Sequence, residues 1–337
     1  MPAQADCTNV GQGAAPMLEV WRGGRLESLH HGHAVICDAR GAIVDAWGNP
    51  DAVIFPRSSC KMLQALPLLE SGAGAALTPA HLALACASHE GGAEHLDLAR
   101  RWLSDLGLGE PDLRCGAHEP RDRAEFERLI RAREAPCQLH NNCSGKHAGF
   151  LMLGQHLGAG PDYVDIDHPV QRAVRAAFEE VTGAESPGWG IDGCSAPNFA
   201  CSVHALAAAM ARFAAASEGD ARSTAMVRLR SAMARHPELV AGRGRACTEL
   251  MHAMDGVAIK TGAEAVFVAI LPGSGHGIAL KIVDGATRAA EAAIVALLAR
   301  SGVLDRAHPA ARRRLGAPMR NWRGLEVGEL RLAAGFG

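Results

Sequence analysis

Aromatic residues are scarce in this sequence, at 4% of 337 residues with a single tyrosine. Hydrophobic residues still make up 48%, so a chain of this length can bury a sizeable core, built largely of alanine, leucine and valine. Neither sign of charge is in excess, because 34 Lys and Arg residues oppose 36 Asp and Glu residues. This balance excludes the basic surface of a nucleic-acid-binding protein and argues against a membrane-surface protein. It also excludes disorder over most of the length.

Long apolar runs and a recognisable export signal are also absent. No stretch reaches the roughly 18 uninterrupted apolar residues of a membrane span. The first sixteen residues have no basic run ahead of an apolar segment, so we expect no signal peptide and a cytoplasmic protein. The ten cysteines lack short regular spacings, which favours reduced thiols over a disulfide framework. They are Cys7, Cys37, Cys60, Cys86, Cys115, Cys137, Cys143, Cys194, Cys201 and Cys247.

Two regions of strand-like hydrophobicity predict a sheet built from both ends of the chain. In residues 18–47, Gly23-Gly24 and Arg40-Gly41 mark the turns of two hairpins. Residues 266–283 predict a third hairpin. Between these regions the hydrophobic spacing is helical, with a kink expected at Pro67. The predicted helices cover residues 80–87, 93–106, 123–133, 170–182, 198–216 and 223–236, and a last one follows at 287–299.

We therefore expect an α/β (α+β) fold in which a helical region is inserted into an antiparallel sheet. After a flexible tail at residues 1–17, residues 18–337 are expected to form a single domain. Its sheet part covers about residues 18–56 and 256–337, and its helical part about residues 57–255.

The segment Arg57-Ser58-Ser59-Cys60-Lys61 places a serine and a lysine three residues apart. In a helix that starts here, the side chains of Ser58 and Lys61 share a face. A serine hydroxyl becomes a good nucleophile only when a base takes its proton, and a lysine can do so only when uncharged. Lowering the pKa of a lysine from ~10.4 to near 7 takes about 4 kcal/mol, which burial and a nearby cation can supply. The alternative is a helix-capping Ser58 followed by a surface Lys61.

A second serine and a second lysine strengthen this interpretation. Ser88 opens a glycine-containing loop, and Lys260-Thr261-Gly262 precedes the C-terminal hairpin. A Lys-Thr-Gly triplet on a strand is the partner of Ser-x-x-Lys in penicillin-recognising enzymes. Taken singly, Ser88 also fits an ordinary helix-end loop and Lys260 an ordinary strand end. Together they favour a serine–lysine amide hydrolase, although the Ser-Asp-Asn motif of a standard β-lactamase is absent at the usual spacing.

Metal-ligating side chains are concentrated in residues 140–147 and 191–197. The thiolates of Cys143 and Cys194, a His or Lys nitrogen and a water could complete a tetrahedral Zn²⁺ site. The spacing is not that of a zinc finger, so other interpretations stay open. The thiols could simply be buried as small hydrophobic groups.

Two more interpretations concern single thiols. Cys143 could be a catalytic thiol activated by His147 or Lys146. Cys247 is a further candidate for the same pocket, or else a core thiol at the start of a helix.

Together these segments resemble the Rhizobium-etli-type L-asparaginases, the thermolabile asparaginase II family, over roughly residues 18–335. The matching segments are residues 56–61, 87–91, 141–149, 191–197 and 259–264. Cys60 and Met62 replace residues that are commoner beside the nucleophile of that family, and neither has a role that we transfer.

The resemblance implies a catalytic domain with a fold like that of the serine β-lactamases and glutaminases, and hydrolysis of L-asparagine to L-aspartate and ammonia. It implies two catalytic pairs, Ser58 with Lys61 and Ser88 with Lys260, of which we favour Ser58 as the attacking group. It also implies a homodimer and a Zn²⁺ ion held by Cys143, Lys146 and Cys194 beside the substrate. The expected substrate-binding residues are Arg57, His89, Asn142, His147, Asp192 and Cys247.

Two functions of other classes stay open. One is a zinc- or thiol-dependent binding or redox-sensing protein without turnover, supported by the ten thiols. The other is a penicillin-recognising acyl transferase, against which the lack of an export signal speaks. An amidase assay combined with metal analysis separates the first from an asparaginase, and a labelled penicillin exposes the second.

Overall fold

The computed structural model describes residues 10–337, which cluster into two compact units. The sheet unit consists of residues up to 59, residues 200–215 and residues 249–337. The helical unit consists of residues 60–199 and 216–248. Within residues 10–337, no helix is both long and apolar enough to cross a bilayer.

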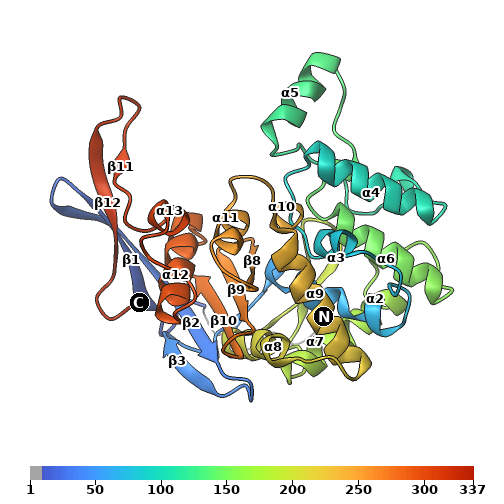
Figure 1. Ribbon diagram of the computed structural model, residues 1–337, viewed down its shortest axis with the longest axis horizontal. Helices are drawn as coiled ribbons and strands as arrows, with labels where there is room; N and C mark the ends of the chain where they lie inside the picture. The colour runs from blue at the N-terminus through green and yellow to red at the C-terminus, as the bar shows by residue number, and fades with distance from the viewer. Residues whose placement is uncertain (1–9) are drawn as a thin grey trace. The chain divides into compact units, whose positions relative to one another are not determined.

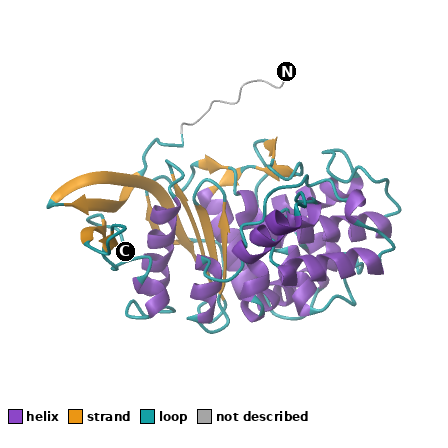
Figure 2. Ribbon diagram, turned by 90° about the horizontal axis from the view of Figure 1, so that it is seen from above, coloured by secondary structure: helices purple, strands orange, loops and turns teal. Residues whose placement is uncertain are grey.

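The sheet unit contains an eight-stranded antiparallel sheet to which both ends of the chain contribute (Figures 1 and 2). The strand order is β11-β12-β1-β2-β10-β9-β8, and β3 pairs with β2 outside this path. The strands are β1 (Ala15–Arg22), β2 (Arg25–Cys37), β3 (Ile43–Trp47), β8 (Ala258–Gly262), β9 (Val266–Leu271), β10 (His276–Ile282), β11 (Met319–Arg320) and β12 (Glu326–Leu332). The predicted α/β fold class is confirmed: an antiparallel sheet is assembled from both chain ends, and a helical region is inserted between them in the sequence.

Hydrophobic residues account for the buried strands in the middle of the sheet. Every residue of β9 is buried, and β9 pairs with β10 as the predicted hairpin. The strand β2 is continuous over thirteen residues, although the sequence predicted two strands there. The strand β1 begins at Ala15, inside the expected tail of residues 1–17, because Ala15 pairs with Gly32 of β2. Residues 1–9 of that tail, with Cys7, lie outside the described residues.

The helices of the sheet unit are α8 (Val203–Ala215), α12 (Thr287–Arg300) and α13 (Pro309–Arg312). The helix expected from residue 198 begins only at Val203. Cys201 and Ser202 are extended because they form β7 and pair with β4 (Val53–Ile54). The helix α8 clusters with the sheet, although its residues fall inside the range that we expected for the helical part.

The helical unit contains most of the predicted helices. In place of the expected kink there is a break at Ala65 between α1 (Lys61–Gln64) and α2 (Leu66–Glu70), and Pro67 lies in the first turn of α2. The helices are α1 (Lys61–Gln64), α2 (Leu66–Glu70), α3 (Pro79–Ala85), α4 (Ala93–Asp105), α5 (Arg123–Ala132), α6 (Ser144–His156), α7 (Pro169–Thr182), α9 (Ala221–Arg235) and α10 (Pro237–Val240), with the 3₁₀ turns η2 (Glu110–Asp112) and η3 (Gln138–His140). Two further elements, η1 (Arg57–Cys60) and α11 (Ala246–His252), contain residues of both units.

The helix α6 positions several of the predicted site residues. It is buried along most of its length, and Gly145 in its first turn packs against α3. A Cβ atom at position 145 would lie 2.4 Å from the carbonyl oxygen of Leu84, so only glycine fits there. This close approach fixes the first turn of α6, which carries Lys146 and His147.

Candidate active site

A buried lysine contacts a serine in the helical unit. Nζ of Lys61 lies 3.1 Å from Oγ of Ser88 and also donates to the carbonyl oxygen of Ala87. The backbone N–H of Ser88 donates to the carbonyl oxygen of Val240 at 2.8 Å, which holds the loop after α3 in place. An amine within hydrogen-bonding distance of a hydroxyl can take the hydroxyl's proton when the amine is uncharged. The structure therefore brings Lys61 to Ser88, a combination that the sequence did not predict.

The other two residues of the predicted pairs belong to the sheet unit. Ser58 lies in the turn η1, which begins at Arg57 with a φ of 53°, a conformation that residues other than glycine rarely adopt. Lys260 on β8 is fully buried, and its Nζ donates to the carbonyl oxygen of Thr261 at 2.8 Å.

The strand β8 packs directly against the segment that leads into this turn. A Cβ atom at Gly262 would lie 2.6 Å from the carbonyl oxygen of Pro56 and 3.1 Å from the backbone nitrogen of Ser59. The Lys260 strand and the Ser58 turn are therefore neighbours within the sheet unit. Pairing of Ser58 with Lys61 and of Ser88 with Lys260 joins residues of different units and stays a prediction.

Two thiols and an amine form a buried cluster in the helical unit. Cys143 immediately precedes α6, and Lys146 lies in its first turn. Cys194 lies in the tight turn between β5 (Trp189–Ile191) and β6 (Pro197–Phe199). Nζ of Lys146 donates to Sγ of Cys194 at 3.0 Å. All three side chains are at most 4% exposed, so the cluster is shielded from bulk water.

The two thiols of this cluster have pKa values that are shifted in opposite directions. The neighbouring Cys143 thiol, followed by the Lys146 ammonium, holds the pKa of Cys194 well below its usual range, although burial opposes this shift. The hydrogen bond to Cys194, together with burial, raises the pKa of Cys143. Burial acts to lower the pKa of Lys146, but the two sulfurs outweigh it and raise this pKa. These shifts favour a thiolate at Cys194 beside a charged Lys146, and a protonated thiol at Cys143.

A histidine and the single tyrosine lie next to this cluster. Oη of Tyr163 accepts from the backbone N–H of Arg114 at 2.7 Å and lies 2.9 Å from Nδ1 of His147. The tyrosine O–H is then the donor to Nδ1, which assigns the remaining ring proton to Nε2. Burial lowers the pKa of His147, and Cys194 opposes that shift. The imidazole is therefore neutral, with a buried Nε2 that has no hydrogen-bond partner among the described residues.

The sequence profile of the L-asparaginase II family matches residues 18–332. The chain belongs to the L-asparaginase II family. Membership in this family supports an amidohydrolase activity. No curated protein sequence matches the chain, so its assignment to the Rhizobium-etli type stays a prediction.

A comparison with solved structures finds likenesses to this family member at low identity and low TM-score. One is Mglu in a tris and glutamate form, at 14% identity and a TM-score of 0.44. The match covers 77% of this chain and 56% of that chain, so this chain spans little more than half of Mglu. Another is a β-lactamase from Mycobacterium bovis, at 12% identity and a TM-score of 0.42. The match covers 77% of this chain and 89% of that chain. A third is the octameric penicillin-binding protein homologue from Pyrococcus abyssi, at 12% identity and a TM-score of 0.38. The match covers 87% of this chain and 80% of that chain. With every TM-score below 0.5, nothing about the chemistry of this chain follows from these likenesses.

Two of the predicted substrate-binding residues hold the scaffold together in this asparaginase II structure. The His89 ring accepts from the Gly91 N–H at Nδ1 over 3.1 Å and contacts Oγ of Ser144 through Nε2 at 2.9 Å. Asn142 accepts the Cys143 S–H at 2.9 Å, and its backbone carbonyl accepts from the His89 N–H at 3.3 Å. Both residues therefore connect the loop after α3 to the start of α6.

The two remaining candidates differ in exposure. Asp192 is half-buried and begins the turn that presents Cys194, since its N–H donates to the carbonyl oxygen of Ala196 at 3.0 Å. Cys247 is 1% exposed near the start of α11, so a place in a substrate pocket stays a prediction. Tyr163 was missed by the sequence analysis, although its being the only tyrosine was a signal that could have singled it out.

The donor atoms at the thiol cluster suit a soft metal ion by type. Sulfur of cysteine and nitrogen are the donors that Zn²⁺ prefers, and Cys143, Cys194 and Lys146 supply two sulfurs and an amine. Within residues 10–337, however, no group of three or more His, Cys, Asp or Glu side chains is placed as in a metal site. A metal here would need Lys146 as the third protein ligand, and this amine would have to lose its proton.

Proposed function

We propose that this member of the L-asparaginase II family hydrolyses L-asparagine to L-aspartate and ammonia. The single observation that carries the proposal is the 3.1 Å contact between Nζ of Lys61 and Oγ of Ser88, because it places a buried amine beside a hydroxyl. Family membership supplies the amide as the bond that is broken. The Rhizobium-etli-type assignment rests on the sequence resemblance.

The proposed reaction begins with attack by Oγ of Ser58 on the side-chain carboxamide carbon. Lys61, three residues further along the chain, takes the hydroxyl proton. The resulting oxyanion is stabilised by backbone N–H groups or by the Ser88 hydroxyl. The nitrogen leaves as ammonia once protonated, and water then hydrolyses the aspartyl ester. Ser88 and Lys260 are the second pair, which relays protons during these two steps.

Charged and polar residues are proposed to hold the substrate. The Arg57 guanidinium would pair with the α-carboxylate, for which its planar fork is suited. His147 and Asp192 would orient the substrate or the metal. His89, Asn142 and Cys247 complete the proposed pocket. Strain at the positive φ of Arg57 supports a functional role for this turn.

We further propose that Zn²⁺ binds to Cys143, Cys194 and Lys146. The ionised Cys194 supports a positive group at this position. When bound, zinc would supply positive charge beside the substrate. Metal analysis of the purified protein tests this: we expect close to one zinc per chain, and a large loss in Cys194→Ser. Absence of zinc from the wild-type protein loaded with excess metal contradicts it.

The activity itself is tested by ammonia release from L-asparagine by the wild type, Ser58→Ala and the matched control Ser59→Ala. Ser59 is the adjacent serine, and its hydroxyl donates to the carbonyl oxygen of Pro56 at 2.7 Å. We expect Ser58→Ala to lose about 10³-fold or more in kcat, while Ser59→Ala keeps activity within a few-fold.

Three results contradict the proposal. Full activity in Ser58→Ala rejects its role as nucleophile. Stoichiometric zinc without turnover of any amide favours a binding protein, and acylation by a labelled penicillin favours an acyl transferase. A homodimer and a cytoplasmic location stay predictions, which the mass in solution and cell fractionation test.

A further inference from the structure

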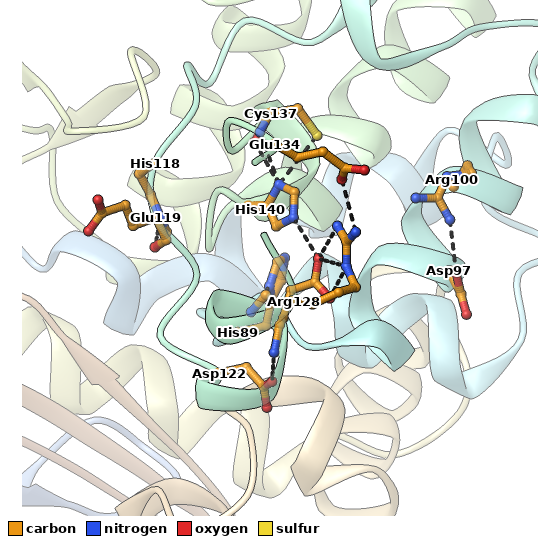
Figure 3. A network of polar contacts seen from close by, with 12 residues as sticks. His89, Asp97, Arg100, His118, Glu119, Asp122, Arg128, Glu134, Cys137 and His140 are labelled. Atoms are coloured by element: carbon orange, nitrogen blue, oxygen red, sulfur yellow. Dashed lines mark hydrogen bonds and ion pairs between the residues drawn. The ribbon is translucent and has the colours of Figure 1, made fainter. Parts of the chain in front are cut away.

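A second set of reactive side chains lines a cleft in the helical unit. The cleft has a volume of about 620 Å³ and is bounded by α4, α5 and the turn η3. Figure 3 shows Cys137 and His140 pointing toward one another, with Arg128 and Glu134 beside them and the pair of Arg100 and Asp97 to one side. None of these residues has a part in the proposed hydrolysis.

A chain of hydrogen bonds runs from a thiol through an imidazole to a carboxylate. Sγ of Cys137 lies 3.3 Å from Nδ1 of His140. Nε2 of the same ring lies 3.1 Å from Oε1 of Glu125. The carboxylate of Glu125 in turn accepts hydrogen bonds from Arg128, at 2.8 Å from Nη2 and at 3.0 and 3.1 Å from Nε. Glu125 and His140 are both buried, so this chain is held within the wall of the cleft.

The carboxylate decides which ring nitrogen carries the proton. Hydrogen bonds from Arg128 and then His140 lower the pKa of Glu125 despite its burial, so Glu125 is ionised at neutral pH and can only accept. Nε2 of His140 must then be the N–H donor. Nδ1 is left with its lone pair, in agreement with the Cys137 backbone N–H that donates to it at 3.0 Å. The Cys137 backbone N–H and the Cys137 thiol, 3.3 Å away, share this lone pair, and an imidazole nitrogen that accepts from a thiol can take its proton.

Cys137 is also accessible. Among the cysteines of residues 10–337, the other eight are buried and Cys137 is partly exposed. Cys115 provides a contrast in the same region, since its Sγ contacts the carbonyl oxygen of Gln138 at 3.5 Å. Cys115 is only 2% exposed, and burial raises its pKa to about 12. Of two neighbouring thiols, one is thus shielded and the other faces the cleft beside a base.

We propose that Cys137 is a reactive thiol that forms a reversible mixed disulfide with small amino-acid or peptide disulfides bound in this cleft. The walls present both signs of charge through two ion pairs, Arg100 with Asp97 and Arg128 with Glu134, each at 2.9 Å. A ligand that carries both ammonium and carboxylate groups is complementary to such walls. The volume is within the usual range for small-molecule sites.

The exchange step balances without a further oxidant. His140 takes the Cys137 proton, and the thiolate attacks one sulfur of the small disulfide. A bond forms between Sγ of Cys137 and that sulfur, while the original S–S bond breaks. The other half leaves as a thiolate and takes the proton from His140. The products are a mixed disulfide on Cys137 and one free thiol, and an excess of small thiol reverses the reaction.

The test follows adduct formation by mass spectrometry at pH 6, with cystine as the probe. An ordinary thiol is almost wholly protonated at this pH, so reaction there depends on His140. The charged groups that line the cleft around the pair are Asp97, Arg100, Glu125, Arg128 and Glu134. His89 lies beside the cluster, and burial, followed by His95, holds its pKa well below the usual range, so it stays neutral.

We expect one adduct per chain in the wild type, located on Cys137, and none in Cys137→Ser. The variant His140→Gln should react about tenfold more slowly at pH 6, and Glu125→Gln should show a smaller loss in the same direction. Protection of Cys115 from an alkylating reagent verifies that each variant is folded. An unchanged rate in folded His140→Gln, or an equally fast adduct on another cysteine, overturns the proposal.

Recognition by the cleft is tested separately by comparing cystine with uncharged hydroxyethyl disulfide. Each rate is divided by the rate for the same protein unfolded in urea, which removes the intrinsic difference between the two reagents. We expect the ratio to be several-fold higher for cystine. An equal or lower ratio overturns the choice of ligand class.

Discussion

The thiol cluster around Cys194 and the thiol in the cleft at Cys137 lie in the same unit but differ in their partners. Cys194 is buried beside the Lys146 amine, which together with Cys143 keeps it ionised. Cys137 is partly exposed, and its partner is an imidazole oriented by a carboxylate. A thiolate locked in a buried ion pair suits a metal or a fixed charge, whereas a thiol that meets a base in an open cleft suits exchange chemistry. The surroundings therefore separate the two roles, and the residue type does not.

Other buried residues show pKa shifts in which burial outweighs the neighbouring charges. Cys60 is as buried as Cys194, but burial raises its pKa to about 12. The same holds for amines: burial lowers the pKa of Lys281 in the sheet unit, where its amine donates to the carbonyl oxygen of Glu264. The thiolate beside Lys146 reverses that direction.

The largest expected effect distinguishes the residues proposed for hydrolysis from the residues of the cleft at Cys137. Lys61→Met removes the amine that contacts Ser88, and we expect kcat for L-asparagine to fall about 10³-fold, within the range for a lost general base. Cys137→Ser is the matched control and should stay within twofold of the wild type. Ammonia release measures both. Retention of more than a tenth of the activity in Lys61→Met contradicts this separation.

The next effect concerns the buried ion pair. Cys194→Ser leaves Lys146 as a buried charge without its thiolate, so we expect the metal-free protein to lose about 3 kcal/mol of unfolding free energy. Urea unfolding in the presence of a chelator measures this loss. The double variant Cys194→Ser with Lys146→Met should recover part of it, because the unpaired charge is gone. Equal stabilities of the double and the single variant are the contradicting outcome.

A smaller effect tests the carboxylate that orients His140. The pKa of Glu125 is lowered in the folded protein, so its contribution is complete above its ordinary pKa of about 4.3 and is lost as the pH falls through the lower, folded value. We expect Glu125→Gln to be about 1 kcal/mol less stable than the wild type at pH 6, because its partner Arg128 is half-exposed. The difference should shrink as the pH falls below this ordinary pKa and through the lower, folded one. Unfolding at several pH values measures it, and a difference independent of pH contradicts it.

The smallest effect concerns the tyrosine that orients His147. Tyr163→Phe removes the O–H that bonds Nδ1 of His147 and leaves the Arg114 N–H without this acceptor. A loss of about 0.5 kcal/mol in unfolding free energy is expected, measured by urea unfolding. If the stability is unchanged, the hydrogen bond does not hold the imidazole in place.

How far the sequence predicts the structure depends on the range of the interaction. The hairpin of β9 and β10 is local and hydrophobic, so its residues predict it directly. The helix α6 escaped prediction because it is buried on most sides and has no polar face to reveal its period. The late start of α8 could not be foreseen either, since the pairing of Cys201 with Ile54 depends on a strand about 150 residues earlier.

For the candidate site, too, the success of prediction depends on the range of the interaction. The motifs around Ser58, Cys143 and Cys194 are local and could be found from the sequence. The contact of Lys61 with Ser88 joins residues that are 27 positions apart, and it depends on how the loop after α3 is held by Val240. The Cys137–His140 pair is local, but its meaning became visible only with Glu125 beside the ring.

The central claim is that a serine hydroxyl, and not a thiol, attacks the carboxamide. Its most direct test is rapid acid quenching of the wild-type protein during turnover of L-asparagine, followed by peptide mass spectrometry. The account predicts an aspartyl ester on the peptide that contains Ser58, and no such adduct in Ser58→Ala. An aspartyl adduct on Cys143 in a protein that turns over asparagine would contradict it.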